Sequence, residues 1–548
     1  MKKNRDRVLI IMACILVVIF SISICPVQLQ NDTFYTIKIG EYIMQNGISD
    51  LNDGTDPFSW HENLPYTFPH WAYDVFVYLI YSMGGFQGIF ISTLVLTSIL
   101  GLSVFHVNRK ITKNNLTSFI ITIGVMYVLK PFVAARAQLL TFILFVWTVY
   151  FIERFLETKK KRYAISLIII PIIIANCHCA VWPFFFVLFL PYIAEYLISF
   201  IPELGTFYRK WRIKVLTKKL KKGKIKKEKI EITGQKVNCL EEKNKIAKFK
   251  HEKRKSNPYK IIVERNKNVK WLILIAIICV FTGFLTPLGD TPYTYLYNTL
   301  QGNTMKYINE HLPLTLIDNK EFLCAIAVFF IILLFTDTKI RLKDLFMAGG
   351  LMYLSFSSRR QVSLFFLIGS VIINKLICKV FDKYDSQGTK NMENKMLTIP
   401  GKIITTSVVL ILSLYMINPK LHSHLINESL YPVKAADYIV ENLNLDDIRL
   451  YNEYNYGSYL LFRGIPVFID SRADLYAPEF NAGKNIFADA INISGINLYY
   501  EDKFKEYNFT HIITHKNSKL NMFLTRNANY KKLYSDDNFY IYERLEDN

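Results

Sequence analysis

Long runs of apolar residues dominate the first 417 positions of the chain. A helix that crosses a bilayer needs about 20 apolar residues, so the longer runs suffice and the shorter ones have soft boundaries. The pattern predicts a mostly α polytopic membrane protein with about eleven transmembrane helices in residues 1–417. The runs are Val8–Cys25, Phe86–Phe105, Leu116–Phe132, Leu139–Phe155, Tyr163–Ala175, Val181–Ile201, Trp271–Leu285, Phe322–Phe335, Leu345–Phe356, Ser363–Cys378 and Ile403–Ile417.

After Ile417 the pattern changes to shorter amphipathic and β-type segments. The segment 433–442 has helical periodicity, and 448–451, 466–469 and 511–514 have the composition of buried strands. Residues 538–542 alternate as expected for a closing edge strand. Helices and strands that alternate in this way predict a C-terminal α/β domain over residues 418–548.

The charge of the chain is concentrated in one loop. Of the formal net charge of +21, the stretch from Tyr208 to Lys270 carries +18, with 24 Lys or Arg against 6 Asp or Glu. Such a Lys-rich insert with few aromatic residues is typical of a solvated segment that lies against anionic lipid. We therefore expect membrane lipids as partners of the insert 208–270 and no nucleic acid.

Basic loops indicate the orientation of the chain, because short Lys- and Arg-rich loops stay on the cytoplasmic side. If the N-terminus is cytoplasmic, every strongly basic loop falls on that side, including 159–162, 339–343 and 379–402. Eleven crossings then make the C-terminal domain extracytoplasmic, together with the loops 26–71 and 289–320. We therefore expect a multi-pass protein of the cell membrane.

The outer loop 26–71 contains acidic, histidine and aromatic residues close to the membrane surface. Asp32, Asp56, His61 and His70 are its candidate site residues. A carboxylate there can accept a proton from a hydroxyl group, and aromatic faces suit sugar rings or an isoprenoid chain. The structural alternatives are that Asp32 caps the following helix, that Asp56 belongs to a turn, and that the tryptophans form an interfacial belt.

The same topology brings further polar residues to the outer face. They are Lys130, Arg136, Asn176, His178, Glu310, His311, Arg359 and Arg360. Charged groups near the hydrocarbon are costly and are usually paired or functional. Two adjacent arginines suit a phosphate, because the guanidinium fork matches its oxygens, although they also occur as interfacial anchors.

Metal binding has little support in the sequence. Cys177 and Cys179 flank His178, but this arrangement lacks the ligand spacing of a zinc site. We expect no cofactor, and an acidic outer loop leaves a divalent metal open. The C-terminal domain has no cysteine after Cys378, so it has to form its core without disulfides.

These features resemble the GT-C superfamily of membrane glycosyltransferases, which includes the protein O-mannosyltransferase and aminoarabinose transferase families, and most closely its uncharacterised bacterial branch. The resemblance lies in the outer loop that opens with Asp32, in the outer C-terminal domain, and in three segments. These are Asn176-Cys177-His178, Ser358-Arg359-Arg360 and Tyr454-Asn455-Tyr456-Gly457-Ser458-Tyr459-Leu460. Several relatives carry an acidic pair in the first outer loop, whereas Thr33 follows Asp32 here.

Asp470, Arg472 and Asp474 follow the predicted strand 466–469, a position where α/β sheets often place ligand groups. They are candidates either for binding an acceptor or for joining the domain to the membrane part.

The resemblance implies an inverting glycosyltransferase that uses a polyprenyl-phosphate-linked sugar at the outer leaflet. In that scheme Asp32 is the general base, while Arg359, Arg360 and Arg136 stabilise the lipid phosphate that leaves. His70 and His178 orient the substrates. The alternative is a non-catalytic protein of the same fold that binds a lipid-linked glycan or anchors a surface assembly. A transporter is disfavoured because the sequence places few ionisable groups at mid-helix, where an alternating-access pathway is expected to need them.

Overall fold

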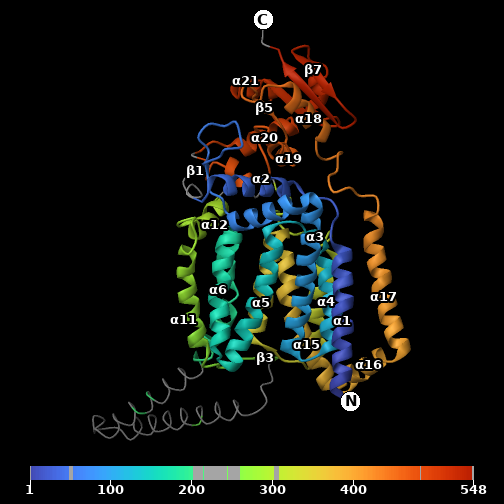
Figure 1. Cartoon of the computed structure of the whole chain (residues 1–548). Helices are drawn as coiled ribbons and strands as arrows, with labels where there is room; N and C mark the ends of the chain where they lie inside the picture. Colours follow the sequence, from blue (N-terminus) through green and yellow to red (C-terminus); the bar gives the residue numbers. More distant parts are fainter. Residues whose placement is uncertain are drawn as a thin grey trace, which may run out of the picture.

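The computed structural model describes residues 2–48, 54–201, 260–301, 308–481 and 483–545, together with Trp211, Lys214 and Asn244. Most of the predicted basic insert 208–270 therefore lies outside the described residues. The described chain is mostly helical. Its helices form a bundle, and the C-terminal segment lies over one end of that bundle (Figure 1). We call residues 433–545 the cap, the end beneath it the capped end, and the opposite end, where the N-terminus lies, the open end.

Each predicted apolar run coincides with a helix of the bundle. Seven of these helical stretches are long and apolar enough to cross a membrane, as in a helical membrane protein, and the others are shorter. The number of eleven crossings stays a prediction. The helices are α1 (Lys2–Ile24), α3 (Trp71–Thr112), α4 (Asn115–Leu129), α5 (Ala137–Thr158), α6 (Lys161–Cys177), α7 (Trp182–Val187), α8 (Leu190–Ile198), α11 (Val269–Val280), α13 (Lys320–Phe335), α14 (Leu342–Ser357), α15 (Val362–Tyr384) and α17 (Ile399–Ile417).

Two helices lie side by side at the capped end of the bundle. Helix α2 (Asn31–Asn46) packs along the first part of α3, and both lie directly beneath the cap (Figure 1). The backbone of α3 leaves helical geometry at Gly85, with φ 58°, which separates its first turns from its apolar second part. The close packing of α2 on α3 depends on Gly40, because a Cβ there would lie 2.6 Å from the Cβ of Tyr78.

The cap contains a four-stranded sheet with the order β5-β6-β8-β7. Its strands are β5 (Leu450–Tyr451), β6 (His511–His515), β7 (Tyr530–Ser535) and β8 (Phe539–Arg544), and its helices are α18 (Val433–Asn442), α19 (Tyr454–Phe462), α20 (Ile486–Gly495), α21 (Tyr500–Glu506) and α22 (Lys519–Leu524). Strands β5 and β6 are parallel, and the other two pairings are antiparallel. The predicted helix 433–442 and the predicted strand at 511–514 are confirmed.

Two strand predictions in the cap are wrong. The segment 538–542 is not an edge strand, because β8 lies between β6 and β7 and bonds to both. The segment 466–469 is not a strand of the sheet, since its backbone forms only an isolated bridge from Val467 to Ser59 of the first loop. Its residues are still buried, as the apolar pattern predicts.

The cap and the capped end of the bundle share one apolar core. Ile39 of α2 and Phe68 of the first loop pack in the same cluster as Tyr451, Phe468 and Tyr542 of the cap. Helix α19 also lies against α2. The remaining elements are β1 (Gly54–Thr55), β2 (Pro65–Tyr66), β3 (Ile261–Ile262), β4 (Ile340–Arg341), α12 (Thr291–Gln301), α16 (Gly388–Met396) and the 3₁₀ turns η1 (Lys130–Phe132), η2 (Cys179–Val181), η3 (Phe281–Phe284), η5 (Arg359–Gln361), η6 (Asn418–Lys420) and η7 (Ala473–Tyr476).

Candidate functional site

The polar residues predicted to converge on one face meet at helix ends beneath the cap. Asp32 lies in the first turn of α2, and Arg136 is the N-cap residue of α5. Arg360 belongs to the turn η5, and Glu310 lies in the loop before α13. Helix ends are where the chain leaves the apolar bundle, so charged side chains placed there can stay close to water.

Arg136 is held between two carboxylates. Its Nε lies 2.8 Å from Oδ2 of Asp32, and its Nη1 donates a hydrogen bond of 3.1 Å to Oε1 of Glu310. Burial disfavours the charged form of Arg136, but Asp32 and Glu310 outweigh it and raise the pKa of the guanidinium. The alternative that Asp32 caps α2 is wrong, because the N-cap residue is Gln30 and the Asp32 carboxylate turns to Arg136.

Arg360 interacts electrostatically with several residues of this group. Its backbone N–H donates to the carbonyl oxygen of Glu310 at 3.0 Å. Its guanidinium forms no ion pair or hydrogen bond with any residue that the structure describes. Burial raises the pKa of Glu310, but Arg136 and then Arg360 outweigh burial and lower that pKa. Burial raises the pKa of Asp474, and Arg360 opposes this rise. Asp474 in turn accepts a hydrogen bond of 2.6 Å from the hydroxyl of Tyr295.

His178 is buried and His70 is half-buried, and their rings form a pair near Arg360. Their ring centroids lie 5.0 Å apart, and Nδ1 of His178 lies 2.9 Å from Oγ1 of Thr141. Burial, and after it the charge of Arg360, lower the pKa of His70 to about 4. Burial, His70 and Arg360 likewise lower the pKa of His178. Both imidazoles are therefore neutral near pH 7 and available as hydrogen-bonding groups.

The loops that carry this histidine pair are tied together by backbone and side-chain bonds. The N–H of Cys179 donates to the carbonyl oxygen of Pro69 at 3.0 Å. Oδ1 of Asn176 accepts a hydrogen bond of 3.1 Å from Nε1 of Trp71. Asn176, a candidate substrate ligand, therefore holds the two loops in place. The indole N–H of Trp71 is likewise satisfied by Asn176.

Arg359 points elsewhere. Its Nη1 donates to Oδ1 of Asn309 at 2.7 Å, and its Nε donates to the carbonyl oxygen of Pro313 at 3.4 Å. The two adjacent arginines thus differ: Arg359 bonds to the loop 308–313, and Arg360 acts electrostatically on the histidines and on Asp474.

Asp56, Asp470 and Arg472 form a separate buried ion cluster between the first loop and the cap. The Arg472 side chain is 4% exposed, and both carboxylates are 0% exposed. Arg472 Nη1 lies 2.6 Å from Asp56 Oδ1, and its Nη2 lies 2.6 Å from Asp470 Oδ2. Burial opposes the charge of Arg472, but Asp470 and Asp56 raise its pKa. We call this cluster the clamp, because its members bind one another across the interface.

His61 belongs to the same interface as the clamp. Its Nε2 lies 2.8 Å from the carbonyl oxygen of Phe468, and its ring stacks on Trp60. Burial lowers the pKa of His61 to about 4. Asp56 also accepts a hydrogen bond of 2.9 Å from the N–H of Ser59, as its predicted turn requires. These residues join the first loop to the cap.

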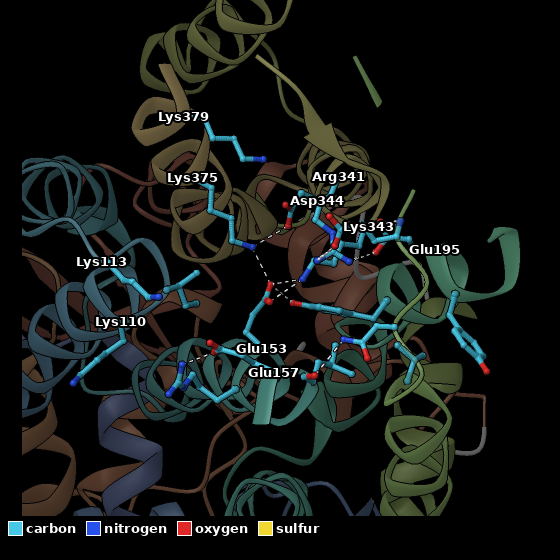
Figure 2. A pocket seen from close by; sticks show the side chains of 18 residues that line it. Lys110, Lys113, Glu153, Glu157, Glu195, Arg341, Lys343, Asp344, Lys375 and Lys379 are labelled. Carbon is cyan, nitrogen blue, oxygen red and sulfur yellow. Dashed lines mark hydrogen bonds and ion pairs between the residues drawn. The ribbon is translucent and has the colours of Figure 1, made fainter. Parts of the chain in front are cut away.

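A second polar cluster, which the sequence analysis did not predict, lies at the open end. It surrounds a cavity of about 420 Å³ between α5, α8, α14 and α15 (Figure 2). A sequence signal was present: Glu153, Glu195 and Lys375 are ionisable residues inside apolar runs. Such residues usually pair with one another, so their partners lie on neighbouring helices.

Among the described residues, no group of three His, Cys, Asp or Glu side chains is arranged to hold a metal ion. Compared with the models of known protein families and with curated proteins, the chain matches none of them.

Proposed function

We propose that the chain is a GT-C-like glycosyltransferase that moves a sugar from a polyprenyl-phosphate-linked donor to an acceptor of the cell envelope, at the capped end of the bundle. The observation that carries the proposal is Arg360, a cation without a partner among the described residues. It lies beside the neutral histidines His70 and His178 and close to Asp474. An anionic oxygen is the partner that such a guanidinium lacks.

In the proposed reaction the acceptor hydroxyl attacks the anomeric carbon of the donor sugar. The bond from that carbon to the phosphate oxygen breaks, and the proton of the hydroxyl goes to Asp32. Arg360 stabilises the charge that grows on the departing lipid phosphate, and Arg136 holds Asp32 in position. This scheme gives His70 and His178 the role of orienting substrate hydroxyls, and no metal takes part in it.

A second candidate function is a non-catalytic protein that binds a lipid-linked glycan. The ion pair between Asp32 and Arg136 favours it, because Oδ2 of Asp32 is already paired with the guanidinium and is not free to accept a proton from a hydroxyl group. Both candidates need Arg360 to bind the donor phosphate, but only the transferase needs Asp32 for turnover.

The test uses purified full-length protein in lipid nanodiscs with radiolabelled polyprenyl-phosphate sugars. Asp32→Asn is expected to lower transfer by roughly 10²- to 10⁴-fold while donor binding persists. Arg360→Gln is expected to lower both, and Arg359→Gln, its matched neighbour, is expected to change transfer much less. Unchanged transfer by Asp32→Asn eliminates Asp32 as the base. Donor binding without transfer by the unaltered protein favours the second candidate.

A further inference from the structure

The cavity at the open end is lined by more positive than negative side chains. Seven Lys or Arg and five Asp or Glu side chains line it. All five carboxylates are engaged in ion pairs within the lining itself. The surplus positive charge of the cavity therefore lies at the basic side chains that these carboxylates do not reach.

One wall of the cavity is a network of paired charges. Lys343 Nζ lies 2.8 Å from Glu153 Oε1, and Lys375 Nζ lies 2.9 Å from the same oxygen. Lys375 also lies 3.0 Å from Asp344 Oδ1. Since the Lys343 side chain is only 5% exposed, these charges are held close to neutral by one another. Losing one partner would leave the others buried and uncompensated.

Two arginines complete this paired wall. Arg341 Nη2 lies 2.7 Å from Glu195 Oε2, and its Nη1 lies 3.0 Å from Glu264 Oε2. Arg154 pairs with Glu157 one turn along α5. Four basic side chains thus satisfy all five acidic ones.

Three lysines of the lining have no carboxylate partner among the described residues, Lys110 and Lys113 on one side of the cavity and Lys379 next to Lys375. Lys110 lies in the last turn of α3, and Lys113 ends that helix in the left-handed conformation. Lys379 lies one turn after Lys375 on α15 and donates a hydrogen bond of 3.0 Å to the carbonyl oxygen of Lys339. Figure 2 shows Lys110 and Lys113 on the side opposite the paired wall. The surplus positive charge that these lysines give the cavity attracts an anion.

The size and lining of the cavity restrict that anion. A volume of about 420 Å³ is in the range of small-molecule sites and exceeds what an inorganic phosphate ion fills. Tyr192, Tyr196, Ile111 and Val269 supply apolar and aromatic surface next to the charges. The cavity therefore suits a phosphate that carries an organic group.

We propose that the open-end cavity binds a phosphate monoester, whose phosphate lies between Lys110 and Lys113 on one side and Lys379 on the other. Phosphatidic acid from the bilayer and a soluble sugar or glycerol phosphate share this chemistry. The site is separate from the polar residues beneath the cap, Asp32, Arg136, Arg360, His70 and His178, which we call the capped-end cluster. It does not depend on the transfer reaction proposed there. Lys375 and Lys343 keep the paired wall in place beside the ligand.

The test measures binding to purified full-length protein in neutral detergent by native mass spectrometry and by thermal shift. The probes are phosphatidic acid, phosphatidylcholine and glycerol 3-phosphate. Saturable binding of phosphatidic acid alone identifies the lipid as the source, and saturable binding of glycerol 3-phosphate identifies a soluble ligand. Either result supports the proposal. Binding of neither, or equal binding of phosphatidylcholine, overturns it.

Variants locate the binding site. Replacing Lys110, Lys113 and Lys379 together by Gln is expected to weaken binding of the phosphate probe roughly tenfold or more, which corresponds to about 1.4 kcal/mol. The same three positions changed to Arg are expected to retain binding. The matched control changes Lys160, Lys161 and Lys390 to Gln, three exposed lysines outside the cavity. An equal loss in the control, or no loss in the cavity variant, overturns the proposal.

Discussion

At the scale of single residues, the capped-end cluster separates charged groups from neutral ones. Arg136 is satisfied by Asp32 and Glu310, whereas Arg360 has no described partner. His70 and His178 stay neutral because burial and Arg360 both oppose their protonation. A substrate phosphate that reached Arg360 would therefore meet one cation and two neutral hydrogen-bonding rings.

The depressed histidine pKa values predict how stability depends on pH. Below the ordinary pKa of 6.5 the unfolded chain takes up protons that folded His61, His70 and His178 do not accept. Stability is therefore complete above that pH and falls as the pH decreases from 6.5 towards 4. We expect the melting temperature in detergent to fall over this window. His70→Gln should reduce the fall in part, because burial also lowers the pKa of His61, His178, His311 and His511.

The control for this measurement is His422→Gln, since His422 is exposed. A His70→Gln variant with the full pH dependence would contradict the burial of His70 in its neutral form.

The convergence of Asp32, Arg136, His70, His178 and an arginine was predictable from hydropathy and the positions of basic loops alone. Which of the two adjacent arginines turns inward was not. Successive helical residues point about 100° apart, and their directions here are fixed by the loop 308–313, which bonds to both arginines. The local sequence contains no signal for that contact.

At the scale of elements, the role proposed for Asp32 requires helix α2, which carries it, to stay close to α3. Gly40→Ala places a Cβ within 2.6 Å of the Tyr78 Cβ and in conflict with the backbone of Asp74. We expect this variant to lose about 1–3 kcal/mol of stability and to weaken sugar transfer. Thermal unfolding and the transfer assay measure the two effects.

Gly124→Ala is the matched control in a helix. A Cβ at Gly124 meets nothing within 4 Å, and the residue is exposed in the middle of α4. This control is expected to be neutral or slightly stabilising. Equal stability of both variants would show that α2 and α3 tolerate a wider spacing.

Element types were more predictable than their order. The apolar runs became helices, and the alternating segment 538–542 became a strand. Alternation reports which face of a strand is buried, but it does not report which strand lies at the edge. Lys531 and Lys532 in β7 were the better indicator, because exposed edges commonly carry lysine.

At the scale of the whole molecule, the clamp fastens the cap to the membrane part of the chain. Arg472→Ala leaves the buried carboxylates of Asp56 and Asp470 without their cation. We expect a loss of about 3–5 kcal/mol and faster proteolysis of the cap. Lys434→Ala removes an exposed pair with Glu428 and should cost less than about 1 kcal/mol. Limited proteolysis that does not distinguish the two variants would contradict the role of the clamp.

The sequence marks single members of the clamp and of the open-end cluster, but it does not show which of them meet. Asp56 and Arg472 are more than 400 positions apart, and Glu153 and Lys375 more than 200. Each residue alone looks like a turn residue or an isolated charge in an apolar run. Only the packing of distant helices and loops shows that these charges neutralise one another.

Helices α5 and α15 contribute to both clusters. Arg136, at the start of α5, and Glu153 are about 25 Å apart along the axis of that helix. Arg360 lies in η5 directly before α15, about 22 Å from Lys375 along the axis of α15. The 2.9 Å bond from Lys375 to Glu153 fixes the register of these two rods at the open end. Sliding one rod along the other by a single residue would move Arg136 past Arg360 by about 1.5 Å. The ion pair at the open end therefore also sets how Arg136 and Arg360 are placed relative to one another at the capped end.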